Sequence, residues 1–184
     1  FNIISDYCIG SNGQVDTVCL YSNVPLKEIE KIFLDFQSRT SVELIKILCR
    51  EYWNIKPVFV DLKEEYYNYI SKKEAALIIG DRAFLFNKKY RYIYDLSYHW
   101  KEYTKLPFVF ACWFSNKNLD PSFSSDFNNI IKNGFQSIDD IIKNRQDDYP
   151  DIDLKDYLKN KISYVLDEKK RKSMRIFLSK INSS

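Results

Sequence analysis

Hydroxyl and charged side chains stand where the sequence predicts that a helix begins or a strand ends. Arg39, Thr40 and Ser41 precede a segment with helical periodicity, and Asp81 and Asp95 each follow a short apolar run. A helix N-terminus with free backbone N–H groups attracts carboxylates, and open α/β sheets bind ligands beyond the carboxyl ends of their strands. The pattern predicts a site for a small anionic molecule.

Each of these residues also has a structural use. Ser and Thr often cap helices without any ligand, so capping and carboxylate binding are both open for residues 39–41. For Asp81 and Asp95 the local sequence favours a structural role, in which the carboxylate accepts hydrogen bonds from loop N–H groups. Arg82 is expected to pair with Asp81 or with an anionic ligand.

Nucleotide and metal chemistry have little support. The glycine-punctuated segment 8–13 is predicted to be a turn before a strand, and it lacks the pattern of a phosphate loop or a dinucleotide fingerprint. His99, the one histidine, is expected at a surface or an edge, without partners for a metal site or a catalytic triad. No cofactor and no metal are therefore expected.

Cysteine usage and charge limit the other classes. The four cysteines have no C-x-x-C spacing and mostly lie in apolar runs, which predicts reduced, mostly buried thiols in a cytosolic protein. The net charge of +3 and the basic run 169–172 fit a solvated helix face and do not indicate nucleic-acid binding. No apolar run approaches the length of about 20 residues that membrane insertion requires.

The elements that must position these residues alternate between strands and helices, which predicts a parallel sheet. Helices are expected at 42–52, at 63–71, and from a cap at Ser97 to the break at Pro107. The expected strands are 15–21, 32–36, 58–60, 75–79 and 92–94.

The rest of the chain is predicted to form one strand, 108–114, and then to be helical. A single apolar face extends from 123 to 142, two further helices follow, and Asp167 is expected to cap the last helix. The three tryptophans follow the apolar periodicity and are expected in the core; they are Trp53, Trp100 and Trp113.

Four segments give the chain a resemblance to the chorismate dehydratase family of menaquinone biosynthesis. They are IISDYCIG, DFQSRTSVELIKILCREYW, IIGDRAF and YDLSYHWKEYTKLPFVFACW, which together extend over most of the sequence. The resemblance implies a two-lobed type II periplasmic-binding-protein fold. Residues 20–107 would then be a complete α/β lobe with a mostly parallel sheet, while 1–19 and 108–184 would belong to the other lobe, whose N-terminal strands are missing.

The resemblance also implies a reaction, the cofactor-free dehydration of chorismate to 3-[(1-carboxyvinyl)oxy]benzoate in the futalosine route to menaquinone. Thr40 and Ser41, with Arg39 nearby, would hold one carboxylate of chorismate. Ser11 and Thr17 would contact its other carboxylate or the reacting ring. The candidate site residues are Ser11, Thr17, Arg39, Thr40, Ser41 and Asp81, of which Ser11 and Asp81 are the catalytic candidates.

Two other functions share this fold. One is the sister enzyme that makes 1,4-dihydroxy-6-naphthoate, which would need a histidine in the cleft. The other is a solute-binding protein for a small carboxylate, without catalysis. Because half of the cleft would be missing, we expect the 184-residue chain to be poorly active by itself. The sequence does not indicate an oligomeric state.

Overall fold

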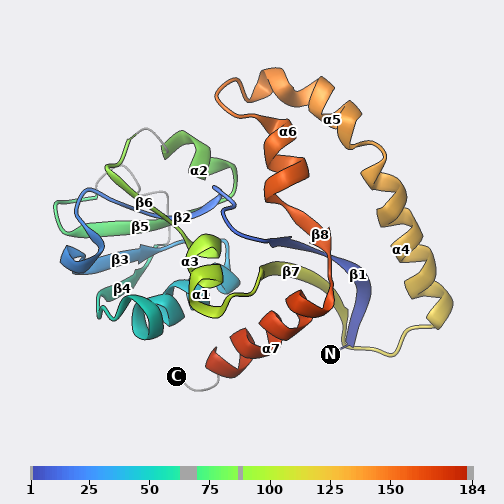
Figure 1. Ribbon diagram of the computed structural model, residues 1–184, viewed down its shortest axis with the longest axis horizontal. Coiled ribbons are helices and arrows are strands. Elements are labelled where there is room, and N and C mark those ends of the chain that lie inside the picture. Colours follow the sequence, from blue (N-terminus) through green and yellow to red (C-terminus); the bar gives the residue numbers. More distant parts are fainter. Residues whose placement is uncertain (1, 63–69, 87–88, 182–184) are drawn as a thin grey trace.

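The computed structural model describes residues 2–62, 70–86 and 89–181. It is a mixed α/β structure with two β-sheets and helices around them (Figure 1). The predicted helix 63–71 falls almost entirely outside the described residues. Within the described ranges, no helix is long and apolar enough to cross a bilayer.

The larger sheet has five strands in the order β4-β3-β5-β2-β6. β3 pairs in parallel with β4 and β5, whereas β2 is antiparallel to both β5 and β6. Four of the five strands therefore run in the same direction, but two of the four pairings are antiparallel. The prediction of a mostly parallel sheet was wrong at β2, which the chain enters from the other sheet. The strands are β2 (Val18–Ser22), β3 (Lys31–Leu34), β4 (Val58–Asp61), β5 (Glu74–Ile79) and β6 (Tyr92–Asp95).

Both faces of this sheet are covered. Alternate residues of a strand point to opposite faces: Leu20 and Leu77 join a core with α1, α3 and α7, whereas Tyr21 and Ile78 pack on the side of α2. The helices, with the π-helical η2 and the short η1, are α1 (Arg39–Ile47), η2 (Leu48–Trp53), α2 (Asp81–Phe86), α3 (Leu96–Thr104), α7 (Glu168–Ile181) and η1 (Leu26–Glu28).

The smaller sheet is antiparallel, with β1 (Asn2–Ser11) between β7 (Phe108–Ser115) and β8 (Ser163–Val165). The predicted turn at 8–13 was wrong for its first part, because pairing with β7 extends β1 to Ser11. β8 was also missed. It has three residues, and its extended form depends on pairing with a strand about 155 residues earlier.

The predicted apolar face from 123 to 142 belongs to two helices, and neither has a buried residue. Asp120 caps α4, and Asp167 accepts the N–H of Lys170 at 2.8 Å, as predicted for the last helix. α4 runs beside the three-stranded sheet (Figure 1). The remaining elements are α4 (Pro121–Phe135), α5 (Ile138–Arg145), η4 (Gln146–Asp148), α6 (Leu154–Asp156) and the π-helical η5 (Tyr157–Lys161).

An aromatic cluster joins the two sheets. Trp100 of α3 is fully buried, and its ring lies 5.4 Å from Phe108 of β7 and 5.9 Å from Phe177 of α7. Its indole N–H donates a hydrogen bond to Ser173 Oγ at 2.9 Å. The prediction of a core role is confirmed for Trp100 and Trp53, but it was wrong for Trp113, which is 53% exposed.

Candidate functional site

Two of the predicted site residues, Thr17 and Asp81, lie at the end of the five-stranded sheet where β5 ends and β2 begins. Gly80 turns the chain there with a φ of +66°, a conformation that favours glycine. Its N–H donates to the Thr17 carbonyl at 2.8 Å. The start of β2 and the start of α2 are thus held side by side.

A cavity of about 450 Å³ opens beside Asp81. Residues from α5 to η5 form its opposite wall, so the cavity lies between α2 and the C-terminal helices. Tyr149 donates its hydroxyl to Asp81 Oδ2 at 3.4 Å. The lining residues are Asp81, Phe84, Ile141, Arg145, Tyr149, Leu154, Tyr157 and Leu158. An apolar wall with phenols, a carboxylate and a guanidinium suits a ring-shaped molecule with anionic substituents.

Tyr157 connects the cavity to Thr17. The two hydroxyl groups share a hydrogen bond at 3.0 Å. Burial raises the pKa of Tyr157, the hydrogen bond with Thr17 lowers it, and the charge of Asp81 raises it. The net effect is a raised pKa, so Tyr157 is a neutral phenol at neutral pH and can donate a hydrogen bond.

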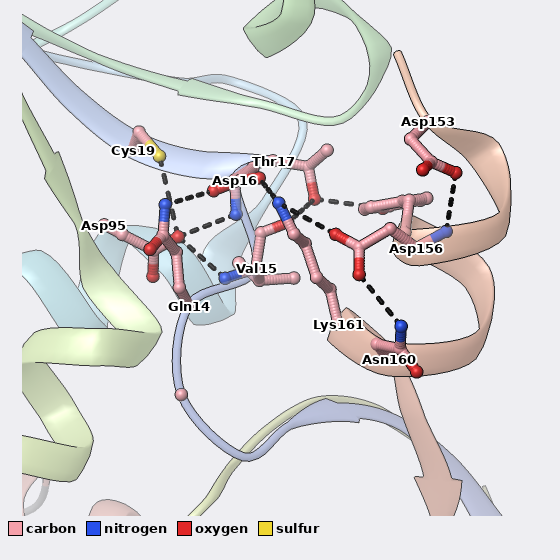
Figure 2. A network of polar contacts seen from close by, with 12 residues as sticks. Gln14, Val15, Asp16, Thr17, Cys19, Asp95, Asp153, Asp156, Asn160 and Lys161 are labelled. Atoms are coloured by element: carbon pink, nitrogen blue, oxygen red, sulfur yellow. Dashed lines mark hydrogen bonds and ion pairs between the residues drawn. The ribbon is translucent and has the colours of Figure 1, made fainter.

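Ion pairing fixes the segment 14–17 to η5, as Figure 2 shows. Lys161 forms an ion pair with Asp16 and lies 3.5 Å from a carboxylate oxygen of Asp156. Asp156 also accepts a hydrogen bond from Asn160 at 2.9 Å. The π-helical turn of η5 places both Tyr157 and Lys161 toward this segment, and such turns are frequent at functional sites.

Asp95 has a structural role, as the sequence favoured. Its buried carboxylate accepts the N–H groups of Val15 at 2.8 Å, Asp16 at 2.7 Å and Tyr98 at 2.9 Å. It therefore caps α3 and holds Asp16 in its left-handed conformation, φ 64°. Burial raises the pKa of Asp95, although the three N–H groups lower it.

The prediction that Ser97 caps this helix was wrong. Asp95, two residues earlier, is the cap, because its carboxylate accepts the N–H of Tyr98. Ser97 lies inside the first turn of α3 and is fully buried.

Ser11 is buried at the end of β1, and its hydroxyl donates to the carbonyl oxygen of Gly13 at 2.9 Å. It does not line the cavity beside Asp81. The geometry thus gives Ser11 a role in the turn after β1, and its catalytic role stays a prediction.

Arg39, Thr40 and Ser41 form the first turn of α1, as predicted. Ser38 is the cap: its Oγ accepts the N–H of Ser41 at 3.1 Å, and it donates to Ser41 Oγ at 2.9 Å. Ser38 and Arg39 line a separate cavity of about 510 Å³, together with Asp35. The structure therefore places Arg39 at a different cavity from the one at Asp81, and neither Thr40 nor Ser41 lines either of the two cavities.

Arg82 pairs with Asp35, a partner that the prediction did not name. Its guanidinium contacts both carboxylate oxygens of the buried Asp35, at 2.8 and 3.1 Å. The prediction missed Asp35, although the same signal, a carboxylate directly after a strand, was available. It also missed Arg145, Tyr149 and Tyr157, because no local signal connects them to Thr17 or Asp81.

Metal binding has no visible basis in the part of the chain that the structure describes, where no three His, Cys, Asp or Glu side chains form a group. His99 lies among aromatic rings: Trp53 donates its indole N–H to His99 Nδ1 at 3.4 Å, and Tyr94 lies 6.0 Å away. Burial lowers the pKa of His99. The cysteine prediction is confirmed in that Cys8, Cys19 and Cys49 are buried free thiols.

Comparison with known proteins places the sequence in a family. A chorismate dehydratase from Thermus thermophilus is 28% identical to the chain over 139 residues, which are 65% of this chain and 49% of that protein. The chain thus spans about half the length of this relative. The model of a family described as menaquinone biosynthesis matches residues 1–183. The chain belongs to this menaquinone-biosynthesis family.

Proposed function

We propose that this chain is part of a chorismate dehydratase, a lyase that removes water from chorismate to give 3-[(1-carboxyvinyl)oxy]benzoate. The observation that carries the proposal is the family match over residues 1–183, with a relative of that name. The proposal includes a cytoplasmic location and the futalosine route, and free, buried thiols fit a reducing compartment. No cofactor is part of the proposal.

The proposed architecture has the two lobes of a type II periplasmic-binding protein. Residues 20–107 would form one lobe, and 1–19 with 108–184 would form part of the other. The sheet composition supports this division, since all five strands of the larger sheet lie between β1 and β7 in the sequence. The cavity beside Asp81 would then lie between the lobes.

Within that cleft we assign Asp81 to orient the ring hydroxyl or accept the ring proton. Tyr157 and Thr17 would donate hydrogen bonds, and Arg145 would pair with a carboxylate of the substrate. The first turn of α1, at residues 39–41, stands at the separate cavity near Asp35, so its binding of a substrate carboxylate is a proposal independent of the ring site at Asp81. Loss of a ring proton and of the hydroxyl makes the ring aromatic, so positioning and exclusion of water supply most of what the reaction needs.

The position of His99 argues against the sister reaction that gives 1,4-dihydroxy-6-naphthoate. That enzyme is expected to use a histidine in the cleft. His99 packs against Trp53 and Tyr94 and does not line the cavity beside Asp81.

The test is to mix chorismate with the 184-residue chain and, separately, with the complete product of its gene, and to follow loss of water by mass spectrometry. We expect dehydration by the complete product and little by this chain alone. Turnover by this chain at the rate of the complete product would contradict the second expectation. Binding of chorismate without turnover would favour a solute-binding protein, and absence of both would refute the proposal.

Asp81→Asn in the complete product sharpens the test. Asp81 is exposed, so the substitution should lower kcat by about tenfold or more with little loss of stability. Asp126→Asn, at an exposed position of α4 away from the cavity, is the matched control and should leave kcat unchanged. Equal kcat values for the two variants would remove Asp81 from the mechanism.

A further inference from the structure

Cys8 and Cys112 are direct partners in the antiparallel pairing of β1 and β7. Residues opposite each other in such a pair have Cα atoms about 4.5–5.5 Å apart and point to the same face of the sheet. A disulfide requires Cα atoms about 4.4–6.8 Å apart. The register therefore places the two Cα atoms in the range that a disulfide requires.

The two side chains also share one apolar cluster. Cys8 packs with Val109 and Leu166, and Cys112 and Met174 pack against the same cluster. Cys8 is 4% exposed whereas Cys112 is partly exposed, so a small reagent meets Cys112 first.

We propose that Cys8 and Cys112 are a reversible redox pair, which closes to a cross-strand disulfide when the protein meets a small-molecule disulfide such as oxidised glutathione. The Cys112 thiolate attacks one sulfur of that molecule, and the first small thiolate leaves. Cys8 then loses its proton and attacks Cys112 Sγ, which forms the protein disulfide and releases the second small thiolate. The two protein thiols lose two electrons, and the small disulfide is reduced to two thiols.

The resting pair is reduced. Burial raises the pKa of Cys8 to about 11, although the positive charge of Lys170 opposes this, and burial also raises the pKa of Cys112. Since the thiolate is the attacking species, exchange at neutral pH is slow and needs a supplied disulfide. Cys19 and Cys49 lie in two other clusters, on opposite faces of the five-stranded sheet.

A disulfide between Cys8 and Cys112 would stabilise the protein because of where the two residues lie in the sequence. β1 leads the chain into the five-stranded sheet, and β7 receives it again. All five strands of that sheet therefore lie between Cys8 and Cys112 in the sequence. A cross-link that closes so long a segment restricts the unfolded chain, so the oxidised protein should unfold at a higher temperature than the reduced protein.

The test uses the reduced 184-residue chain, folded and incubated with oxidised glutathione, then quenched by alkylation. We expect an intact mass lower by two hydrogens before alkylation, linked peptides that contain Cys8 and Cys112, and a raised unfolding temperature. Dithiothreitol should reverse all three. If the folded protein keeps four free thiols, or the linked peptides contain Cys19 or Cys49, or the bond joins two chains, the proposal is wrong.

Two double variants provide matched controls. Cys19→Ala/Cys49→Ala keeps the proposed pair and should form the same disulfide. Cys8→Ser/Cys112→Ser keeps the two other thiols and should form none. The single variant Cys8→Ser should stop at a glutathione adduct on Cys112. Peptide mapping of the unsubstituted chain identifies the bond without any variant. The test therefore stays decisive even if one of the variants does not fold.

Discussion

The two sheets of this protein bury similar apolar sequences to very different degrees. In the five-stranded sheet every residue of β2 is buried, and residues 75–78 of β5 are completely inaccessible. In the smaller part, Trp113 and Phe114 of β7 are 53% and 60% exposed, and α4 and α5 have no buried residue. Apolar periodicity thus shows which face requires a partner, but it does not show that the chain supplies one.

The largest difference between the two regions is expected when one tryptophan in each is replaced by alanine. Trp100→Ala removes a fully buried ring and its hydrogen bond to Ser173, so we expect a loss of about 3–5 kcal/mol in the free energy of unfolding. Trp113→Ala removes a half-exposed ring that touches Phe127 and should cost about 1 kcal/mol or less. Urea denaturation of both variants measures the difference, and equal losses would show that the smaller sheet is as tightly packed as the larger.

A smaller effect is expected from pH in the well-packed region. Glu51 of η2 accepts hydrogen bonds from Lys180 of α7 and from Tyr103 of α3, the latter at 2.8 Å. Burial by itself would raise its pKa, but these bonds and that from Arg50 outweigh burial and lower the pKa from 4.5 to about 2.

Because the pKa of Glu51 is lower in the folded state, its stabilising contribution is complete above pH 4.5 and is lost as pH falls to about 2. Glu51→Gln should therefore be less stable than the unsubstituted chain near pH 7, by about 1–2 kcal/mol after allowance for partial exposure. The difference should shrink as pH falls through that window, as urea denaturation at several pH values can measure. A difference that does not change with pH would mean that the carboxylate charge contributes nothing.

The smallest expected effect lies on the exposed apolar side of the smaller region. Phe114→Ser and Ile130→Gln change side chains that are 60% and 68% exposed, so each should alter the free energy of unfolding by about 0.5 kcal/mol or less. Both should reduce non-specific aggregation measured by light scattering and leave the oligomeric state unchanged. A large loss of stability, or a change from a defined oligomer to a monomer, would show that another molecule covers these residues in solution.

Local signals predicted what depends on neighbouring residues. The positions of β5 and β7 and the helix starts at Asp120 and Asp167 agree with the structure, because apolar runs and caps act over a few residues. The prediction that Ser97 caps α3 was wrong because two nearby polar residues, Asp95 and Ser97, could each serve as the N-cap. Asp95 has the extended backbone of a cap and reaches the Tyr98 N–H, which left Ser97 inside the helix.

The contacts of the candidate site were not predicted, for a similar reason. Thr17, named from the resemblance, bonds to Tyr157, and Asp81, named from its place after a strand, bonds to Tyr149. Nothing in the neighbourhood of either tyrosine indicates these contacts, because the partners are 140 and 68 residues apart in the sequence.

The sequence by itself determined the alternation of strands and helices, the residue types of the candidate site and the resemblance to a family. Only the tertiary structure decided that β2 runs antiparallel, that Arg82 pairs with Asp35, and that Cys8 faces Cys112. Periodicity and capping are properties of short windows, whereas strand direction and register are fixed by which distant segments bury each other's apolar faces. A shift of one residue in β1 would turn Cys8 to the other face without changing any local signal.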